Sequence, residues 1–148
     1  MGCAASTSAD ARATSRPSST GPRLEDLYEV NYDRRIGTGH YGTVYYGRAR
    51  DTGCGVAVKV LQRARSRPER LENEVDILRR VSHPAVVALR DVFETPDTVV
   101  IVTELVEGGE LFDRLVKRGP FSERAAAAVV RQIASAIAYL HSQGIIHR

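Results

Sequence analysis

Three closely spaced glycines and the residues after them constrain the fold of this 148-residue chain more than any other feature. Gly37, Gly39 and Gly42 form the pattern Gly-x-Gly-x-x-Gly, which is typical of a backbone that approaches phosphate groups closely. Such glycines either join a strand to a helix or lie in a hairpin between two strands. Residues 43–46 are Thr-Val-Tyr-Tyr, and β-branched and aromatic residues favour a strand. The sequence therefore predicts the hairpin.

A second extended segment follows this hairpin. Asp-Thr-Gly at residues 51–53 is typical of a turn, and residues 56–60 alternate three valines with Ala57 and Lys59. A lysine within an apolar strand is costly unless it is paired, so Lys59 is a candidate functional residue. The helix and the later acidic residue that a dinucleotide-binding fold requires are both missing. An antiparallel sheet is therefore expected.

With these segments in place, the sequence resembles a protein kinase. Ile-Gly-Thr-Gly-His-Tyr-Gly-Thr-Val (36–44) is similar to the family's glycine-rich loop, and Val-Ala-Val-Lys (56–59) to its third strand. Residues 72–87 resemble helix C and the entry to the fourth strand. Residues 99–115 resemble the fifth strand, the hinge and helix D, and residues 138–148 resemble the end of helix E and the start of the catalytic loop. The resemblance is specific because several independent motifs keep both their order and their spacing.

The resemblance implies an α+β fold. A small antiparallel sheet would carry helix C, and a hinge would lead to helices D and E of an incomplete helical lobe. We expect a disordered tail over residues 1–23 and a partial kinase domain over residues 24–148. The implied function is the ATP-binding portion of a serine/threonine kinase, which transfers phosphate from ATP to a protein substrate. Residues 104–115 are most similar to the calcium/calmodulin-dependent and calcium-dependent kinases.

The resemblance also implies roles for individual residues. Lys59 would contact the α- and β-phosphates of ATP, Thr103 would stand at the back of the adenine pocket, and Glu110 would contact the ribose. The backbone groups of Glu104 and Val106 would pair with the adenine edge. The residues expected to bind ATP are Ile36, Gly37, Thr38, Gly39, His40, Tyr41, Gly42, Thr43, Val44, Ala57, Lys59, Thr103, Glu104, Val106 and Glu110.

Lys59 requires an acidic partner, and the segment 68–81 offers several glutamates. Leu71, Val75 and Leu78 recur at helical spacing and define a buried face. Glu74 lies next to that face and four residues before Leu78, where the family has its glutamate. Glu69 and Glu72 point more toward solvent. We therefore predict a catalytic pair formed by Lys59 and Glu74.

In the family, His-Arg is followed by the catalytic aspartate, and this sequence ends at Arg148. The resemblance implies that the catalytic-loop asparagine and the Asp-Phe-Gly aspartate, which hold Mg²⁺, would also come later. We therefore expect a chain truncated just before the catalytic aspartate, with no metal ligand of its own and no activity alone. The alternative is a membrane-tethered, non-catalytic interaction module that resembles a pseudokinase.

The first 23 residues contain no Leu, Ile, Val or aromatic residue, which predicts disorder. Their start, Met-Gly-Cys-Ala-Ala-Ser, fits the pattern for myristoylation at Gly2, and Cys3 could carry a palmitoyl chain. Two acyl chains would give stable anchoring. We therefore expect a protein at the cytoplasmic face of a membrane. The net charge of +3 is too small to indicate nucleic acid as a partner.

A long amphipathic helix is predicted over residues 123–143. Ser122 is a suitable N-cap, and Gly144 is a typical residue just past a helix end. Its apolar stripe recurs at helical spacing and consists of Val129, Ile133, Ala136, Ile137 and Leu140.

Overall fold

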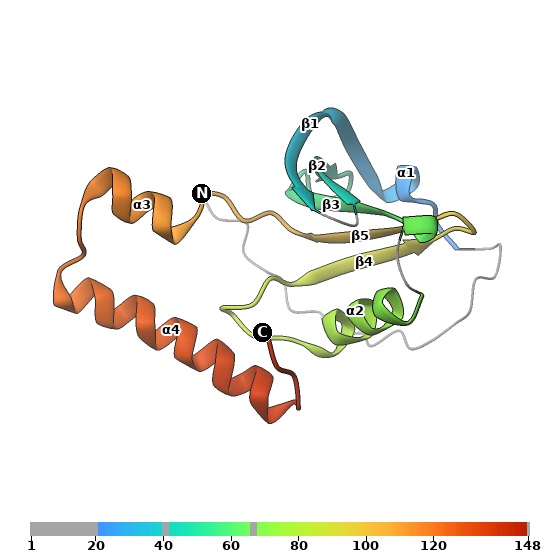
Figure 1. The fold of residues 1–148 in the computed structure, drawn as a ribbon. Coiled ribbons are helices and arrows are strands. Elements are labelled where there is room, and N and C mark those ends of the chain that lie inside the picture. Colours follow the sequence, from blue (N-terminus) through green and yellow to red (C-terminus); the bar gives the residue numbers. More distant parts are fainter. Residues whose placement is uncertain (1–20, 40–41, 66–67, 148) are drawn as a thin grey trace.

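The computed structural model of this chain describes residues 21–39, 42–65 and 68–147. Within these residues, five strands form one antiparallel sheet with the order β1-β2-β3-β5-β4 (Figure 1). The elements are α1 (Leu24–Leu27), β1 (Tyr28–Gly39), β2 (Gly42–Ala49), β3 (Gly55–Gln62), the 3-10 turn η1 (Arg63–Arg65), α2 (Pro68–Arg80), β4 (Leu89–Glu94), β5 (Thr98–Glu104), α3 (Leu111–Arg118) and α4 (Glu123–Ser142). The expected α+β fold and the glycine hairpin between β1 and β2 are confirmed.

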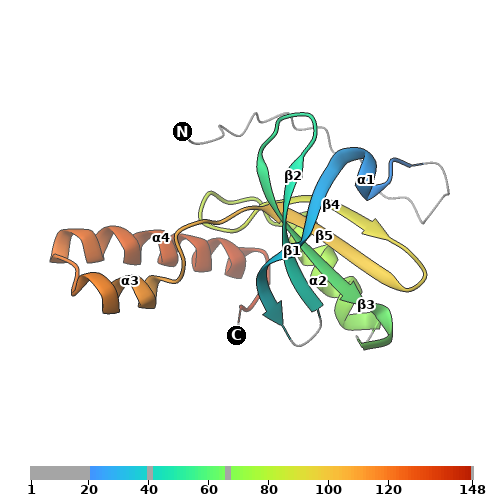
Figure 2. The same ribbon diagram turned by 90° about the horizontal axis from the view of Figure 1, so that it is seen from above.

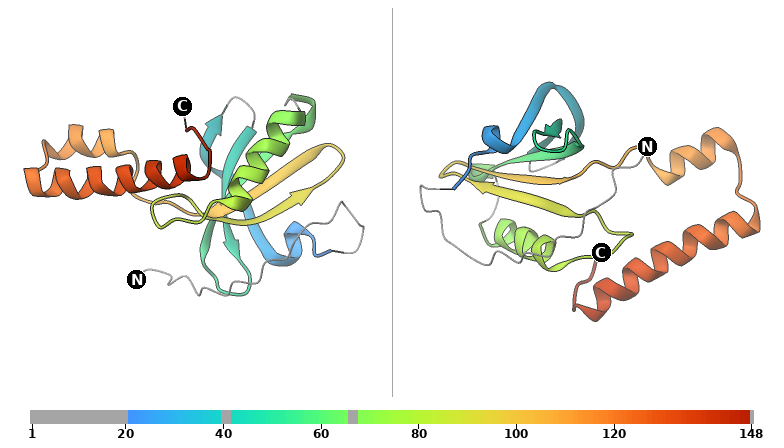
Figure 3. Two further views of the ribbon diagram at one scale, coloured as in Figure 1. Left: turned by 90° about the horizontal axis from the view of Figure 1, so that it is seen from below. Right: turned by 180° about the vertical axis from the view of Figure 1, so that it is seen from behind.

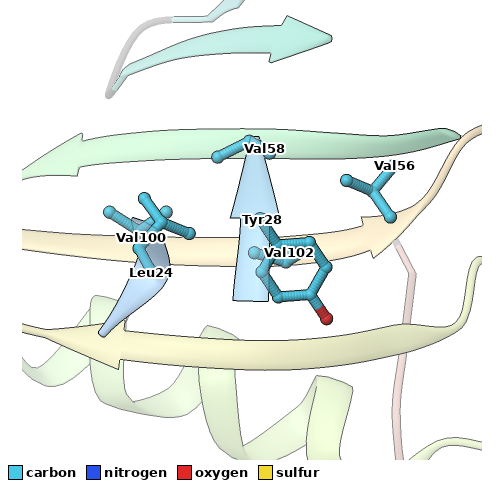
Figure 4. Packing of buried hydrophobic residues seen from close by; sticks show 6 residues of the cluster. All are labelled: Leu24, Tyr28, Val56, Val58, Val100 and Val102. Atoms are coloured by element: carbon cyan, nitrogen blue, oxygen red, sulfur yellow. The ribbon is translucent and has the colours of Figure 1, made fainter. Parts of the chain in front are cut away.

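One face of the sheet is covered by the start of the folded region. Leu24 of α1 and Tyr28 of β1 pack over valines of β3 and β5 (Figure 4). Valines two positions apart in a strand point to the same face, which explains this continuous apolar surface. The buried members of the cluster are Leu24, Tyr28, Val56, Val58, Val100 and Val102. Each such side chain contributes roughly 1.5–3 kcal/mol when it is fully buried.

The hydroxyl group of Tyr28 fixes this cluster to the sheet. It donates a hydrogen bond to the carboxylate of Asp91 in β4, and the Tyr28 ring packs edge-on against Phe93. Burial, and then the Asp91 carboxylate, raise the pKa of the Tyr28 phenol, so the phenol stays neutral and able to donate.

Replacing Tyr28 with phenylalanine is expected to lower the free energy of unfolding by about 1–2 kcal/mol. The ring would still fill its place, but the partly buried Asp91 carboxylate would lose this donor. Urea denaturation followed by circular dichroism measures the change. Tyr32→Phe is the control, because the Tyr32 side chain is exposed. Equal stabilities of the two variants would contradict a stabilising role for the Tyr28 hydroxyl.

Helix α2 lies against the opposite face of the sheet (Figure 3, left). Its predicted apolar side is buried there, with Leu78 half-buried beside it. The buried members of this second cluster are Leu61, Leu71, Val75, Val99 and Ile101. Leu61 and Val99 pair near the end of the sheet that is remote from α3, so α2 covers that end. Ala57 and Thr103, nearer the segment that leads to α3, are half-buried and lie outside the cluster.

After β5 the chain leaves the sheet and forms α3, which lies beyond the end of the sheet, and then α4, which runs back toward the sheet (Figures 1 and 2). The predicted limits of α4 are confirmed. The Ser122 hydroxyl accepts a hydrogen bond from the Ala125 N–H at 3.3 Å, and Gly144 has a φ of +70°, which favours glycine.

The loop between α2 and β4 connects the sheet to α4. The Ser82 N–H donates to the Tyr139 hydroxyl at 2.9 Å, and the His83 ring stacks on the Tyr139 ring with centroids 5.2 Å apart. His83 Nδ1 also accepts a hydrogen bond from the Ala85 N–H at 3.1 Å. His83 is thus a hydrogen-bonding residue at a turn, as its position in Ser-His-Pro suggests.

The apolar stripe of α4 is only partly covered. Ala136 and Leu140 are buried, whereas Ile133 and Ile137 are 47% and 42% exposed. Val130 beside them is also exposed. Contiguous exposed apolar surface of this kind is typical of interaction surfaces.

Candidate functional site

The open half of the α2-covered sheet face brings together four of the predicted site residues. Ala57 and Lys59 are two positions apart in β3 and therefore point to one face. Val44 of β2 lies directly opposite Lys59, and Thr103 of β5 lies directly opposite Ala57, so both share that face. Val44, Ala57 and Thr103 form a small, mainly apolar surface with one cation at its border.

Lys59 reaches α2 from this surface. Its Nζ lies 2.5 Å from Glu74 Oε1, and the two side chains are 34% and 40% exposed. Glu74 is half-buried, whereas Glu69 and Glu72 are exposed, so α2 presents Glu74 to Lys59 as the helical spacing suggests. Because both charges remain accessible, the pair leaves donors of the ammonium group available to an anion at the open face.

The three glycines differ in what surrounds them. A Cβ at Gly42 would lie 2.1 Å from the Val60 carbonyl oxygen of β3, so this glycine is required for the packing of β2 on β3. At Gly37 and Gly39, the nearest atoms to such a Cβ would be 3.7 Å and 3.9 Å away. These are ordinary van der Waals distances, so a side chain at either position would displace no neighbour. Gly37 is half-buried and Gly39 is exposed, so a phosphate group could approach their backbones.

The other residues predicted in the hairpin do not all face the Lys59 side of the sheet. His40 and Tyr41 lie outside the described residues, and Ile36 is 42% exposed. Thr43 lies opposite Val60 and so shares the face away from Lys59, as does its partner Thr38. Thr38 and Thr43 can therefore contact a ligand on the Lys59 side only through their backbone groups.

The segment between β5 and α3 borders the same open face. The Glu104 N–H donates to the Ala88 carbonyl at 3.0 Å, and the Glu104 carboxylate accepts from the Ala88 N–H at 2.9 Å. Its carbonyl oxygen accepts a hydrogen bond from the Thr103 hydroxyl at 3.2 Å, and a carbonyl oxygen has two lone pairs. In the described part of the chain, the backbone of Val106 makes no hydrogen bond, and its side chain is 67% exposed. Donor and acceptor groups are thus available along this edge.

Glu110 stands at the N-cap of α3. Its side chain is exposed and makes no capping hydrogen bond, so the carboxylate is not used by the helix itself. The φ values of Gly108 and Gly109, +107° and +75°, turn the chain between the edge and α3. This turn places Glu110 beyond the edge, with its carboxylate free to meet a polar or basic group.

No metal centre is found in the described ranges, where no group of three or more His, Cys, Asp or Glu side chains could hold an ion. The lipidation candidates Gly2 and Cys3 lie outside these ranges. None of the helices within them is both long and apolar enough to cross a membrane.

Three residues of β1 and β2 beside this surface were not predicted as functional residues. The Arg34 guanidinium lies over the Tyr46 ring, 4.1 Å from its centroid, and the Asn31 side chain accepts two backbone hydrogen bonds beside it. Tyr46 lies opposite Ala57 and thus on the Lys59 face. The available signal was Asn-Tyr-Asp within a strand, because asparagine and aspartate are rare there.

Together, these groups are chemically suited to a flat heteroaromatic ring with a polyanionic tail. The apolar surface and the polar edge suit a heteroaromatic ring, and Lys59 with the open backbones of Gly37 and Gly39 suits phosphates. Glu74 keeps the ammonium group oriented toward that region.

Similarity to known proteins agrees with this geometry. The profile of the protein kinase domain matches residues 30–148. Myosin light chain kinase A of Dictyostelium discoideum is 41% identical over 128 aligned residues, a match that covers 84% of this chain and 43% of that protein. Calcium/calmodulin-dependent protein kinase type IV of Homo sapiens is 43% identical over 125 aligned residues, covering 84% and 26%.

The fold is also similar to a solved structure. The crystal structure of Rad53 1–466 in complex with AMP-PNP superimposes with a TM-score of 0.73 at 32% identity, covering 84% of this chain and 33% of that one. The chain thus spans less than half the length of each of these relatives.

Proposed function

Since this chain belongs to the protein kinase family, we propose that its folded part binds ATP as the nucleotide-binding portion of a serine/threonine protein kinase. The observation that carries the proposal is the Lys59–Glu74 pair, at 2.5 Å, on the open sheet face beside the glycine hairpin. The AMP-PNP bound to the similar Rad53 structure supports the choice of nucleotide.

Each part of ATP has a proposed place. The adenine ring lies between the apolar side chains of Val44 and Ala57 and the edge beyond Thr103. The Glu104 carbonyl accepts from the adenine amino group, and the Val106 N–H donates to a ring nitrogen. The Lys59 ammonium donates to the α- and β-phosphates while Glu74 orients it. Glu110 accepts a hydrogen bond from the ribose.

Mg²⁺ would neutralise the phosphate charge and align the terminal phosphate for transfer. The described residues do not fit this ion, because they contain no cluster of acidic ligands. We therefore assign only nucleotide binding and orientation to these residues. The proposed catalytic aspartate and metal ligands belong to family motifs that follow the His-Arg pair.

Isothermal titration of the chain with ATP, adenosine and GTP tests the proposal. We expect ATP to bind more tightly than adenosine, because Lys59 and the glycine hairpin contact phosphates. GTP should bind more weakly than ATP. Guanine has a carbonyl oxygen where adenine has its amino group, so it cannot donate a hydrogen bond to the Glu104 carbonyl. Equal binding of all three ligands, or no binding, would rule out an ATP site.

For the whole protein, we propose phosphoryl transfer to serine or threonine of protein substrates. Its similarity to proteins named as a myosin light chain kinase and a calcium/calmodulin-dependent protein kinase supports the kinase activity. The exposed Glu110 carboxylate is suited to a basic residue of a peptide substrate. The matched peptide experiment compares phosphorylation of a basic peptide with that of a variant in which the arginines are alanines.

We also propose attachment to the cytoplasmic face of a membrane through Gly2 and Cys3. Gly2→Ala in cells is expected to release the protein from the membrane fraction, because one remaining acyl signal binds only marginally. Intact-mass analysis checks the modification directly. An unmodified Gly2 in protein isolated from eukaryotic cells would contradict it.

A membrane-tethered, non-catalytic interaction module is the second candidate. The exposed Ile133 and Ile137 on α4 favour it, since this surface is available to a partner. Sequencing the 3′ end of the native transcript separates the candidates. An aspartate codon after Arg148, followed later by Asp-Phe-Gly, supports the kinase, whereas a stop codon with a product found in cells supports the module.

A further inference from the structure

Strand β1 contains an irregularity just before the glycine hairpin. Asn31 lies opposite Tyr46, but the next paired residue, Arg35, lies opposite Tyr45. Residues 32–34 are therefore extra residues in β1, inserted between two consecutive residues of β2. A bulge of this kind bends a strand and redirects its side chains. It lies close to Gly37, the first glycine of the hairpin.

The Asn31 side chain holds the bulge in its shape. Its Oδ1 accepts hydrogen bonds from the N–H groups of Asp33, at 3.1 Å, and of Arg34, at 3.0 Å. These two N–H groups belong to extra residues that have no place in the strand ladder. An asparagine side chain that accepts from nearby backbone groups fixes a local turn. The bulge is thus a defined turn within β1.

Two side chains of the bulge hold β2 from opposite faces. The Tyr32 ring packs edge-on against Tyr45, with centroids 5.2 Å apart and planes at 68°. The Arg34 guanidinium lies over the Tyr46 ring at 4.1 Å. Tyr45 and Tyr46 are consecutive and therefore point to opposite faces of the sheet. The bulge thus contacts both faces of β2 at one point.

This contact lies at the base of the hairpin that borders the phosphate region. Val44 lies two residues nearer the hairpin than Tyr46 and on the same face as Lys59. It pairs with Gly37. Between the bulge and Gly37 stand only Arg35 and a second, one-residue irregularity at Ile36. We therefore expect a movement of β1 on β2 at the bulge to shift Gly37 and Gly39, because both are paired to β2. The backbone orientation of the two glycines therefore depends on the contact between the bulge and β2.

We infer that Asn31, Tyr32 and Arg34 are positioning residues that hold the glycine hairpin in the arrangement that binds phosphates. The inference rests on the proposed ATP site. Contacts formed before binding reduce the entropy lost on binding, so their removal weakens the affinity for the group that the hairpin contacts. That group is the triphosphate, whereas the adenine contacts come mainly from β3 and from the β5–α3 edge.

The test compares ATP with adenosine as ligands of the full chain, by isothermal titration. In the double variant Asn31→Ala/Arg34→Ala, we expect the ATP dissociation constant to rise about fivefold to twentyfold. The adenosine dissociation constant should change less than about twofold, because adenosine has no phosphate. Asn31→Asp should restore most of the ATP affinity of Asn31→Ala, since it keeps the acceptor oxygen.

Asp51→Ala is the matched control. Asp51 Oδ1 also accepts a backbone hydrogen bond, from Thr52 at 2.6 Å, but in the turn at the opposite end of β2. It should leave both dissociation constants unchanged. A parallel loss of ATP and adenosine affinity in the bulge variant would overturn the inference, because it would indicate a general loss of folded protein. An unchanged preference for ATP would also overturn it.

Hydrogen exchange of the free chain separates this inference from the proposed function. Asn31→Ala should speed exchange at the amides of Gly37 and Val44, and Asp51→Ala should not. Unchanged exchange at both amides overturns the inference whatever the chain binds. If exchange increases but the unmodified chain does not prefer ATP to adenosine, the proposed ATP site is wrong. The proposed role of Asn31, Tyr32 and Arg34 in phosphate binding would then be wrong as well.

Discussion

Lys59→Met is expected to lower the affinity of the chain for ATP by about 10- to 100-fold and to leave its fold intact. Hydrogen bonds from a charged donor to phosphate oxygens contribute roughly 1.5–3 kcal/mol, and methionine supplies none. Stability should change little, because the Glu74 carboxylate is 40% exposed and can be solvated by water when its partner is lost. Isothermal titration with ATP measures the affinity, and a thermal melt measures the stability.

Arg63→Met is the matched control for this experiment. Arg63 forms an ion pair of similar exposure with Glu94, at 2.8 Å, but it follows the end of β3 that α2 covers. This variant should lose no ATP affinity. If Lys59→Met binds ATP as tightly as the unmodified chain, Lys59 does not contact the phosphates. If both variants lose affinity equally, general electrostatic attraction accounts for the effect.

Gly42→Ala is expected to destabilise the folded state by about 3 kcal/mol or more. The added Cβ would lie 2.1 Å from the Val60 carbonyl oxygen, which belongs to the backbone of the neighbouring strand. A side chain could rotate away, but this oxygen can move only if β2 and β3 separate, so the effect should reach the upper part of the range for overpacking. Urea denaturation of the purified variant measures the loss.

Gly39→Ala provides the contrast. The nearest atom to its Cβ would be the Gly42 carbonyl oxygen, 3.9 Å away, so the variant should fold with nearly unchanged stability. Its ATP affinity should still fall, because the methyl group would occupy space at the phosphate region. An unchanged melting temperature for Gly42→Ala, or a large drop for Gly39→Ala, would contradict these different roles of the two glycines.

Several parts of this protein were determined by local sequence. The residues after Gly42 are β-branched and aromatic, which favours the hairpin over a helix, and the structure contains that hairpin. The spacing of Leu71, Val75 and Leu78 defined the buried side of α2, and Ser122 and Gly144 marked the limits of α4. These features depend on side-chain periodicity and on caps, which act within a few residues.

Other features depend on how distant strands pair. Gly37, Gly39 and Gly42 look equivalent in sequence. Of the three, only Gly42 has no room for a Cβ, because the backbone of the paired strand β3 lies against it. Thr43 was predicted to bind the nucleotide, but its register with Val60 turns its side chain to the other face.

The bulge at residues 32–34 was missed for the same reason. Asn-Tyr-Asp within a strand indicates an irregularity, but the number of inserted residues is known only when the partner strand fixes the register. Local sequence therefore predicted the hairpin, the strand that carries Lys59, the buried side of α2 and the limits of α4. Pairing between distant strands decided which of those residues share a face, because the face of each side chain depends on register and not on local propensity.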